Sequence, residues 1–231
     1  MKTRISLAAV LLACATCANA APAVPAAAPS DAAVKAAKYA VTAYRDDVVD
    51  TLAKLVSFNT VADKDLPFER NPRHAGFKNY LKQESARLGL DFADHGQVLV
   101  IGLGPLDRSS EPGKLLARGA EDDKGPIATA LYAMKSLKDL QLPLSRRIEL
   151  YVYMAEESDW DALEQFVKTH TLPQVNITLD ADSRLFPRAL SFGPAMPHSV
   201  YTGHSEHEFI TLKQLLLNLE MYTAVLVELA R

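Results

Sequence analysis

Residues 117–126 read Ala117-Arg118-Gly119-Ala120-Glu121-Asp122-Asp123-Lys124-Gly125-Pro126, which sets the carboxylates of Asp122 and Asp123 just ahead of a predicted helix. Proline has a fixed φ and no N–H, so Pro126 suits the first helical position. Apolar residues then recur at helical spacing, at Ile127, Leu131, Met134 and Leu137. The helix dipole favours ionised carboxylates at that end. Rigid carboxylate oxygens at a strand-to-helix corner can bind a divalent metal, although an acidic capping turn has the same pattern.

Further acidic residues follow apolar, strand-like runs. Residues 148–155 are β-rich and bulky on both faces, as expected of a buried central strand, and Glu156-Glu157 follow them. A second run, 175–179, ends at Asp180. Alternating strands and helices predict an α/β fold with a mixed, largely parallel central sheet flanked by helices. Such sheets bind ligands at the carboxyl ends of their strands, so we expect Asp122 and these other carboxylates at one edge.

The remaining hydrophobic periodicity predicts the elements that surround this edge. A short strand is expected over residues 98–103. Helices are expected over residues 34–56, from Pro72 to a C-terminal cap at Gly89, from Pro126, over residues 159–170, and from Leu212 towards the C-terminus.

Composition limits the classes of partner. Apolar residues make up 48% of the 231 residues and charged residues 23%, which is typical of a globular protein. The formal net charge is −3 and no basic stripe occurs, so we expect neither nucleic acid nor an anionic membrane as a partner. No nucleophile elbow of the Gly-x-Ser-x-Gly type and no phosphate-binding Gly-rich loop is present.

The N-terminus has the pattern of an export signal. Met1–Arg4 is positively charged, residues 5–14 are apolar, and Ala18-Asn19-Ala20 is a cleavage signal. We therefore expect a signal peptide over residues 1–20, a disordered Ala/Pro-rich lead-in over 21–33, and a single catalytic domain over 34–231, located in the periplasm or secreted. Leu11-Leu12-Ala13-Cys14 offers a weaker, rival reading as a lipoprotein box.

Both cysteines, Cys14 and Cys17, lie in this predicted signal peptide. The mature protein would therefore have no disulfide and no cysteine nucleophile. No later run is long and apolar enough to span a bilayer, so no membrane association is expected after cleavage.

The acidic residues, together with a histidine from Gly203-His204-Ser205-Glu206-His207-Glu208, form a candidate metal set. Mixed carboxylate and imidazole ligands suit zinc, with manganese or cobalt as substitutes. Of the two neighbouring glutamates, one can bind the metal while the other takes a proton from the attacking water. Taken singly, the Glu-Glu pair also fits a solvated turn, and His204 a surface or core histidine.

Three motifs, in order along the chain, resemble the two-zinc exopeptidases of the M20 class, with the dipeptidase branch the most similar. They are Arg118–Pro126, Glu156–Ser158 and Gly203–Phe209. The resemblance extends from about Val41 to Arg231 and implies a zinc-peptidase-like α/β/α catalytic domain.

The resemblance also implies metal ligands. Asp122 would bridge two zinc ions, Glu157 and His204 would hold one of them, and Asp180 would hold the other. One zinc would then have three protein ligands, which suffices for a catalytic site with room for water. The other would have only two and would bind weakly.

The implied activity is hydrolysis of dipeptides or short peptides. Glu156 would act as the general base, and Asp123 would orient the neighbouring ligand shell rather than bind the metal. Side-chain preference and oligomeric state stay open.

The chain departs from the family pattern in two places. Family members carry a His-x-Asp motif upstream of the Asp-Asp-Lys stretch, but here residues 101–105 run directly into 106–109 without it. Family members also insert a lid domain before the final histidine, whereas residues 186–193 join the two halves directly. His95 could replace the missing histidine, but its place ahead of the 98–103 strand predicts the wrong end of the sheet.

Two alternatives follow. The chain can be a catalytically impaired or inactive descendant that retains one metal site. In another class, Val175–Asp182 resembles the strand-borne Asp-x-Asp of haloacid-dehalogenase-type phosphatases. That chemistry needs a lysine and an acidic pair downstream, and only Lys213 and no such pair follow.

Overall fold

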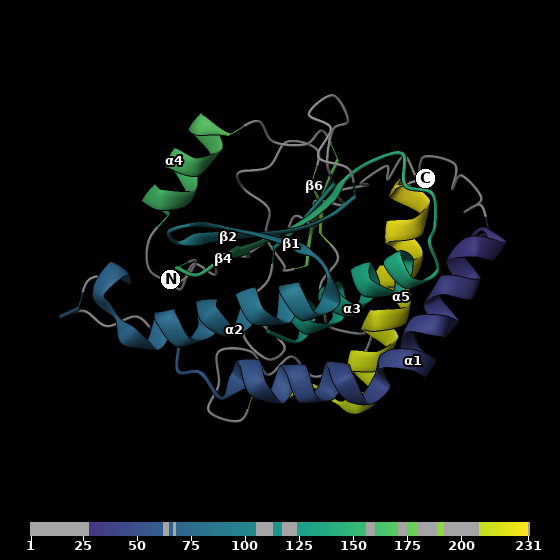
Figure 1. The fold of residues 1–231 in the computed structure, drawn as a ribbon, viewed down its shortest axis with the longest axis horizontal. Coiled ribbons are helices and arrows are strands. Elements are labelled where there is room, and N and C mark those ends of the chain that lie inside the picture. The colour runs from purple at the N-terminus through teal and green to yellow at the C-terminus, as the bar shows by residue number, and fades with distance from the viewer. Residues whose placement is uncertain are drawn as a thin grey trace, which may run out of the picture.

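A mixed sheet with helices on both faces forms the described part of the computed structural model (Figure 1). The structure describes residues 28–61, 65–66, 68–104, 113–116, 124–155, 160–170, 175–179, 189–191 and 208–230. Its elements are α1 (Asp31–Val56), η1 (Phe68–Arg70), α2 (Pro72–Leu88), β1 (Asp91–His95), β2 (Val98–Leu103), β3 (Gly113–Leu116), α3 (Lys124–Asp139), β4 (Ile148–Tyr153), α4 (Asp161–Thr169), β5 (Asn176–Thr178), β6 (Ala189–Ser191) and α5 (Leu212–Ala230).

The described strands form one six-stranded sheet in the order β1-β2-β4-β3-β5-β6. β2 is antiparallel to both β1 and β4, whereas the β4–β3, β3–β5 and β5–β6 pairs are parallel. The predicted mixed, largely parallel sheet is therefore confirmed. Because β3, β4 and β5 run in the same direction, their carboxyl ends lie at one edge of the sheet.

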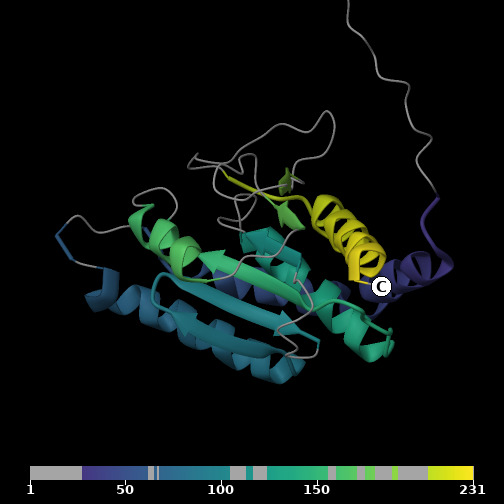
Figure 2. The same cartoon turned by 90° about the horizontal axis from the view of Figure 1, so that it is seen from above.

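Successive residues of β2 face opposite sides of the sheet, as the strand pleat requires. Leu99 and Ile101 pack into the main core, which α1, α2, α3 and α5 cover. Val98 and Val100 face the other side, where Leu163 of α4 packs. Figures 1 and 2 show α4 on one side of the sheet and α2 on the other. All six residues of β2 are therefore buried, which explains its continuous apolar sequence.

Local capping explains where the first two helices begin. The Ser30 hydroxyl accepts a hydrogen bond from the Ala33 N–H at 3.2 Å, so α1 begins at Asp31, three residues before the predicted start. The last residues of the predicted 21–33 lead-in are thus helical, and Ala33 is fully buried. α2 begins at Pro72 and ends before Gly89, which has a φ of 67°, as predicted.

α3 occupies the centre of the main core. It begins at Lys124, so Pro126 is its third residue rather than its first; the missing N–H is tolerated there because the first turn has no intrahelical acceptors. The predicted face at Ile127 and Leu131 is buried, and so are the other sides, because α1 and α5 enclose the helix opposite the sheet.

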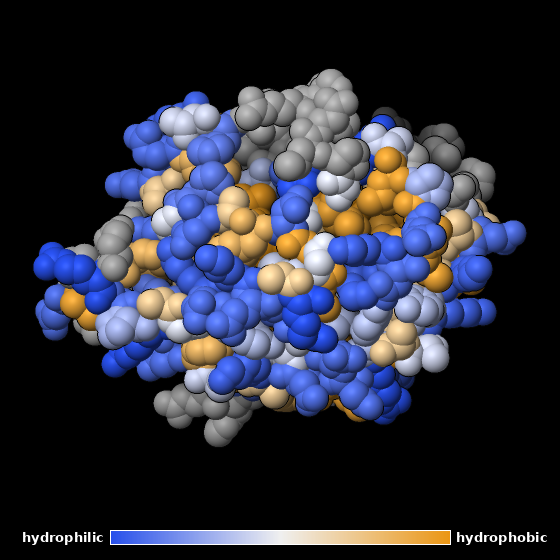
Figure 3. All heavy atoms as spheres, viewed as in Figure 1, coloured by the Kyte–Doolittle hydropathy of each residue, from blue (hydrophilic) through white to orange (hydrophobic). Residues whose placement is uncertain are grey.

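The other elements differ from the sequence prediction mainly at their ends. α4 is shorter than the predicted 159–170, and β5 is shorter than 175–179. α5 begins at Leu212 as predicted, although Leu212 itself is 43% exposed. None of the helices among the described residues is long and apolar enough to cross a membrane. The face shown in Figure 3 is mostly hydrophilic, with apolar residues interspersed.

Candidate active site

The carboxyl edge of β3, β4 and β5 is the place where the predicted metal site would form. Leu116 at the end of β3 lies opposite Tyr151 of β4, and Lys114 lies opposite Asn176 of β5. The segments that carry Asp122, Glu156-Glu157 and Asp180 each begin where one of these strands ends. Three segments with acidic residues therefore leave the sheet at the same edge, as the sequence predicts for a ligand site.

The side chains themselves lie outside the described residues. This holds for Asp122, Asp123, Glu156, Glu157, Asp180 and His204. Within the described ranges, no group of three or more histidine, cysteine, aspartate or glutamate residues could hold a metal. The convergence of these six side chains thus stays a prediction. Their donor chemistry, carboxylate with imidazole, fits zinc.

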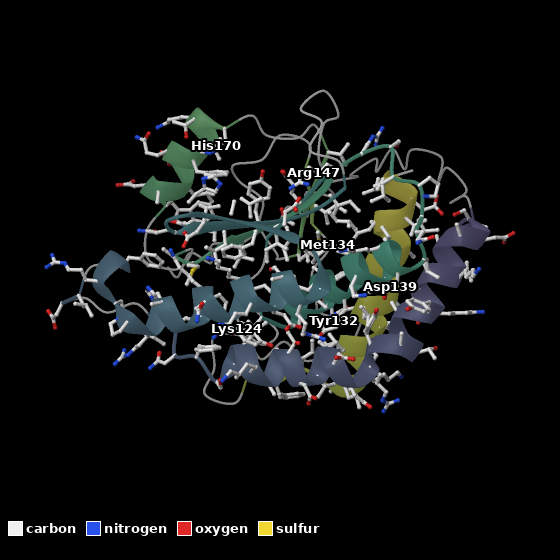
Figure 4. All side chains as sticks on the ribbon, in the orientation of Figure 1. Lys124, Tyr132, Met134, Asp139, Arg147 and His170 are labelled. Atoms are coloured by element: carbon white, nitrogen blue, oxygen red, sulfur yellow. The ribbon has the colours of Figure 1, made fainter. Side chains whose placement is uncertain are left out.

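Lys124 anchors the downstream end of the acidic stretch. Its Nζ donates a hydrogen bond to the Phe58 carbonyl at 3.2 Å and lies 5.9 Å from the centre of the Phe77 ring (Figure 4). A positive charge at a helix N-terminus interacts unfavourably with the helix dipole. The Phe58 carbonyl and the electron-rich face of the Phe77 ring offset this cost for the Lys124 ammonium. The contact ties the segment after α1 to the residue that follows Asp122 and Asp123. The sequence offered no signal for the role of Phe58.

A buried polar network links α1, α2 and α3. Glu84 of α2 is 6% exposed and accepts hydrogen bonds from Arg87 Nη2 at 2.7 Å, from the Tyr132 hydroxyl at 2.9 Å and from the Thr51 hydroxyl at 3.3 Å. Arg87 Nε adds a bond of 2.9 Å to the second carboxylate oxygen. Through Tyr132, labelled in Figure 4, the network joins α3, the helix that follows the acidic stretch, to α1 and α2.

The pKa values of this network follow from burial and bonding. Burial raises the pKa of Glu84, but the hydrogen bonds from Arg87 and Tyr132 outweigh it, so the pKa lies below its ordinary value. Burial, and then the neighbouring Glu84 carboxylate, raises the pKa of Tyr132. At neutral pH Glu84 is therefore a carboxylate and Tyr132 a neutral phenol, so the phenol donates the hydrogen bond and the carboxylate accepts it.

A second charged cluster lies at the opposite edge of the sheet. The Arg147 guanidinium, just before β4, donates to Glu149 Oε1 and to Asp91 Oδ2, both at 2.9 Å. The Tyr151 hydroxyl donates to the other Glu149 oxygen at 2.7 Å. Because this cluster sits at the amino end of β4, away from the predicted ligands, it serves the scaffold.

The predicted position of His95 was wrong. Because β2 is antiparallel to β4, Val98 lies opposite Tyr153, and His95 lies opposite Val98. His95 is therefore at the same edge as the carboxyl end of β4. Its ring lies 5.3 Å from Phe166 and 4.9 Å from His170, both on the α4 side of the sheet. The sequence did not reveal β1, because Asp91–His95 lacks an apolar alternation.

Comparison with known proteins agrees with this fold and with the motifs. Residues 101–177 match the model of Peptidase family M20/M25/M40. "Putative dipeptidase YtjP" of Bacillus subtilis is 42% identical over 78 residues, which is 34% of this chain and 17% of that protein. A Staphylococcus aureus protein of the same description is 28% identical over 175 residues, 63% of this chain and 37% of that protein. The chain thus spans 17% and 37% of the length of these two relatives.

Solved structures share the fold at low sequence identity. Human carnosine dipeptidase 1 has a TM-score of 0.55 and 18% identity, over 67% of this chain and 42% of that one. The LapA aminopeptidase of Legionella pneumophila has a TM-score of 0.59 and 14% identity, over 87% and 75%. These likenesses confirm the α/β peptidase-type fold. The resemblance predicted from the motifs is therefore confirmed: residues 101–177 of this chain are similar to the M20/M25/M40 peptidases.

Proposed function

We propose that this chain hydrolyses peptide bonds in dipeptides or short peptides at the carboxyl edge of β3, β4 and β5. One observation carries the proposal: three strands of one direction end at one edge, and each leads into a segment with a predicted acidic ligand. The match of residues 101–177 to the peptidase family and the dipeptidase names of the relatives support peptides as the substrate class.

Zinc is the proposed cofactor, one ion or two, with manganese or cobalt as substitutes. Asp122, Glu157 and His204 would hold one ion, and Asp180 would join Asp122 at a weaker second position. Bound zinc supplies Lewis-acid activation of water and of a peptide carbonyl.

Within this proposal, Glu156 accepts the proton of the attacking water and later delivers it to the leaving amine. Asp123 orients the ligand shell without contacting the ion. The first twenty residues would direct the chain to the periplasm or the exterior.

A catalytically impaired domain that retains one metal site is the second candidate. It is favoured by the direct run from residue 101 to 109, which lacks the His-x-Asp motif, and by the short join over residues 186–193 in place of a lid. Loss of one oxyanion-stabilising group alone costs about 2.7–4 kcal/mol of barrier in a hydrolase.

The test compares the intact chain with Glu156→Gln and His204→Ala, measuring zinc content and turnover of a dipeptide panel. Glu156→Gln should retain zinc and lose about 100-fold or more in rate, because a general base contributes at least that much. His204→Ala should lose zinc. Glu164→Gln, on an α4 side chain that is 49% exposed, is the matched control and should change neither quantity.

If both site variants keep the zinc content and rate of the intact chain, the site assignment is wrong. An intact chain that binds zinc and turns over no dipeptide would instead select the impaired domain.

A further inference from the structure

Three rings meet where α4 packs on the β1–β2 hairpin. His170, labelled beside α4 in Figure 4, follows that helix. Its ring stacks on that of Phe166 with ring centres 3.9 Å apart and an interplanar angle of 13°. The His95 ring centre lies 4.9 Å from that of His170 and 5.3 Å from that of Phe166. Together these distances set His95 beside the stack rather than above it. An edge of the His170 imidazole therefore faces His95.

His170 Nδ1 has two hydrogen-bond partners. It lies 3.1 Å from the Phe166 carbonyl oxygen and 3.0 Å from the Thr169 hydroxyl. A carbonyl oxygen only accepts, so in the tautomer in which Nδ1 donates to Phe166, Nε2 has the lone pair. Metal-binding histidines are usually oriented in this way, by an N–H bond from the second nitrogen to a backbone carbonyl.

His95 is also held in its neutral form. Burial, followed by the neighbouring His170, lowers the pKa of His95. Asp94 acts in the opposite direction, but its carboxylate pairs with Lys78 Nζ at 3.0 Å. On α4 itself, Lys168 pairs with Glu164 at 3.8 Å. At neutral pH His95 is thus an uncharged imidazole, the form that binds metals.

We propose that His95 and His170 form a two-histidine site for a late first-row divalent ion such as Zn²⁺, Ni²⁺ or Cu²⁺. A metal–nitrogen bond of about 2.0–2.1 Å places each imidazole centre about 3.1–3.2 Å from the ion, so two rings at a near-tetrahedral angle have centres about 5 Å apart. The observed separation is 4.9 Å. Imidazole suits these ions, and water completes their coordination.

The site joins two elements that are far apart in the sequence. His95 ends β1, and His170 follows α4, whose N-terminus is preceded by the segment with Glu156-Glu157. A bound ion would bridge them and hold α4 against the sheet. Because an ion that binds only the folded chain stabilises it, binding also raises the unfolding temperature. None of the residues proposed for peptide hydrolysis takes part, so the two proposals can fail separately.

The test is Cu²⁺ and Ni²⁺ binding by the full chain, with His204→Ala as the background that removes the proposed catalytic site. Nitrogen splitting in the Cu²⁺ electron paramagnetic resonance spectrum counts the coordinated imidazoles, and calorimetry with Ni²⁺ gives the affinity. His95→Phe and His170→Phe keep a ring at each position and remove its nitrogens. Lys168→Ala, on a side chain that is 63% exposed, is the control.

We expect two imidazole nitrogens coordinated to Cu²⁺ in the parent, which is the chain with His204→Ala alone. Adding His95→Phe or His170→Phe should leave at most one coordinated nitrogen and lower the Ni²⁺ affinity at least tenfold. The control should bind as the parent does, and binding should weaken from pH 7.5 to 5.5 as protons compete. Two coordinated nitrogens in either Phe variant, or one nitrogen in the parent, would overturn the proposal. If a Phe variant does not fold, His95→Gln replaces it with the same expectation.

Discussion

Removing the Tyr132 hydroxyl tests whether the buried network holds α3 in place. Tyr132 is fully buried, and its oxygen lies 2.9 Å from Glu84 Oε1, 2.6 Å from Arg87 Nη2 and 3.0 Å from the Thr51 hydroxyl. Tyr132→Phe keeps the ring and deletes one donor to a buried carboxylate. A hydrogen bond to a charged group contributes about 1.5–3 kcal/mol, and Glu84 keeps its two Arg87 bonds, so no charge is left unpaired.

We therefore expect Tyr132→Phe to lower the free energy of unfolding by about 1.5–3 kcal/mol in urea titrations followed by circular dichroism. For a chain of this size the midpoint of thermal unfolding should fall by about 3–12 °C. Tyr39→Phe is the matched control, since its hydroxyl donates to Asp139 at an exposed site and should matter by less than about 0.5 kcal/mol. A Tyr132→Phe protein as stable as that control would refute the role assigned to the network.

Two further predictions concern the same scaffold. The pKa of Glu84 in the folded chain lies below its ordinary value of 4.5, so its ionised form stabilises the fold above that pH, and this contribution is lost as pH falls through the folded pKa. The difference in free energy of unfolding between the intact chain and Glu84→Gln should therefore shrink in acid. A constant difference from about pH 7 to 3 would contradict this. At Gly89, where φ is 67°, alanine should cost about 1–2 kcal/mol in the same urea assay, and asparagine should cost less because it tolerates this conformation; equal losses would contradict the backbone explanation.

The sequence predicted most of the helices because the signals for their ends and their apolar faces involve residues only a few positions apart. Pro72 and Gly89 mark the two ends of α2, and the apolar spacing behind Pro126 marks the face of α3. The start of α1 was missed by three residues because Ser30 caps it from within an Ala/Pro-rich stretch that resembles a linker. β1 was missed because its side chains are mostly exposed and polar, so pairing with β2 rather than its own pattern makes it a strand.

The candidate site was predicted from motifs, and the structure supports the edge at which they would meet. Strand ends predicted near Asp122, Glu156 and Asp180 do lie on parallel neighbours. The contacts of Lys124 with Phe58 and the ring cluster around His170 had no signal in the sequence, because each partner comes from a distant segment.

By itself, the sequence determined the approximate spans of the helices, the ends of α2, the buried central strand, and the order of motifs that resembles M20 peptidases. Only the tertiary structure decided the direction of β2, which moves His95 to the carboxyl edge of β4 and beside His170. The physical reason is range. Caps and periodicity act between residues a few positions apart, whereas strand direction depends on which distant segments pair to satisfy their backbone hydrogen bonds.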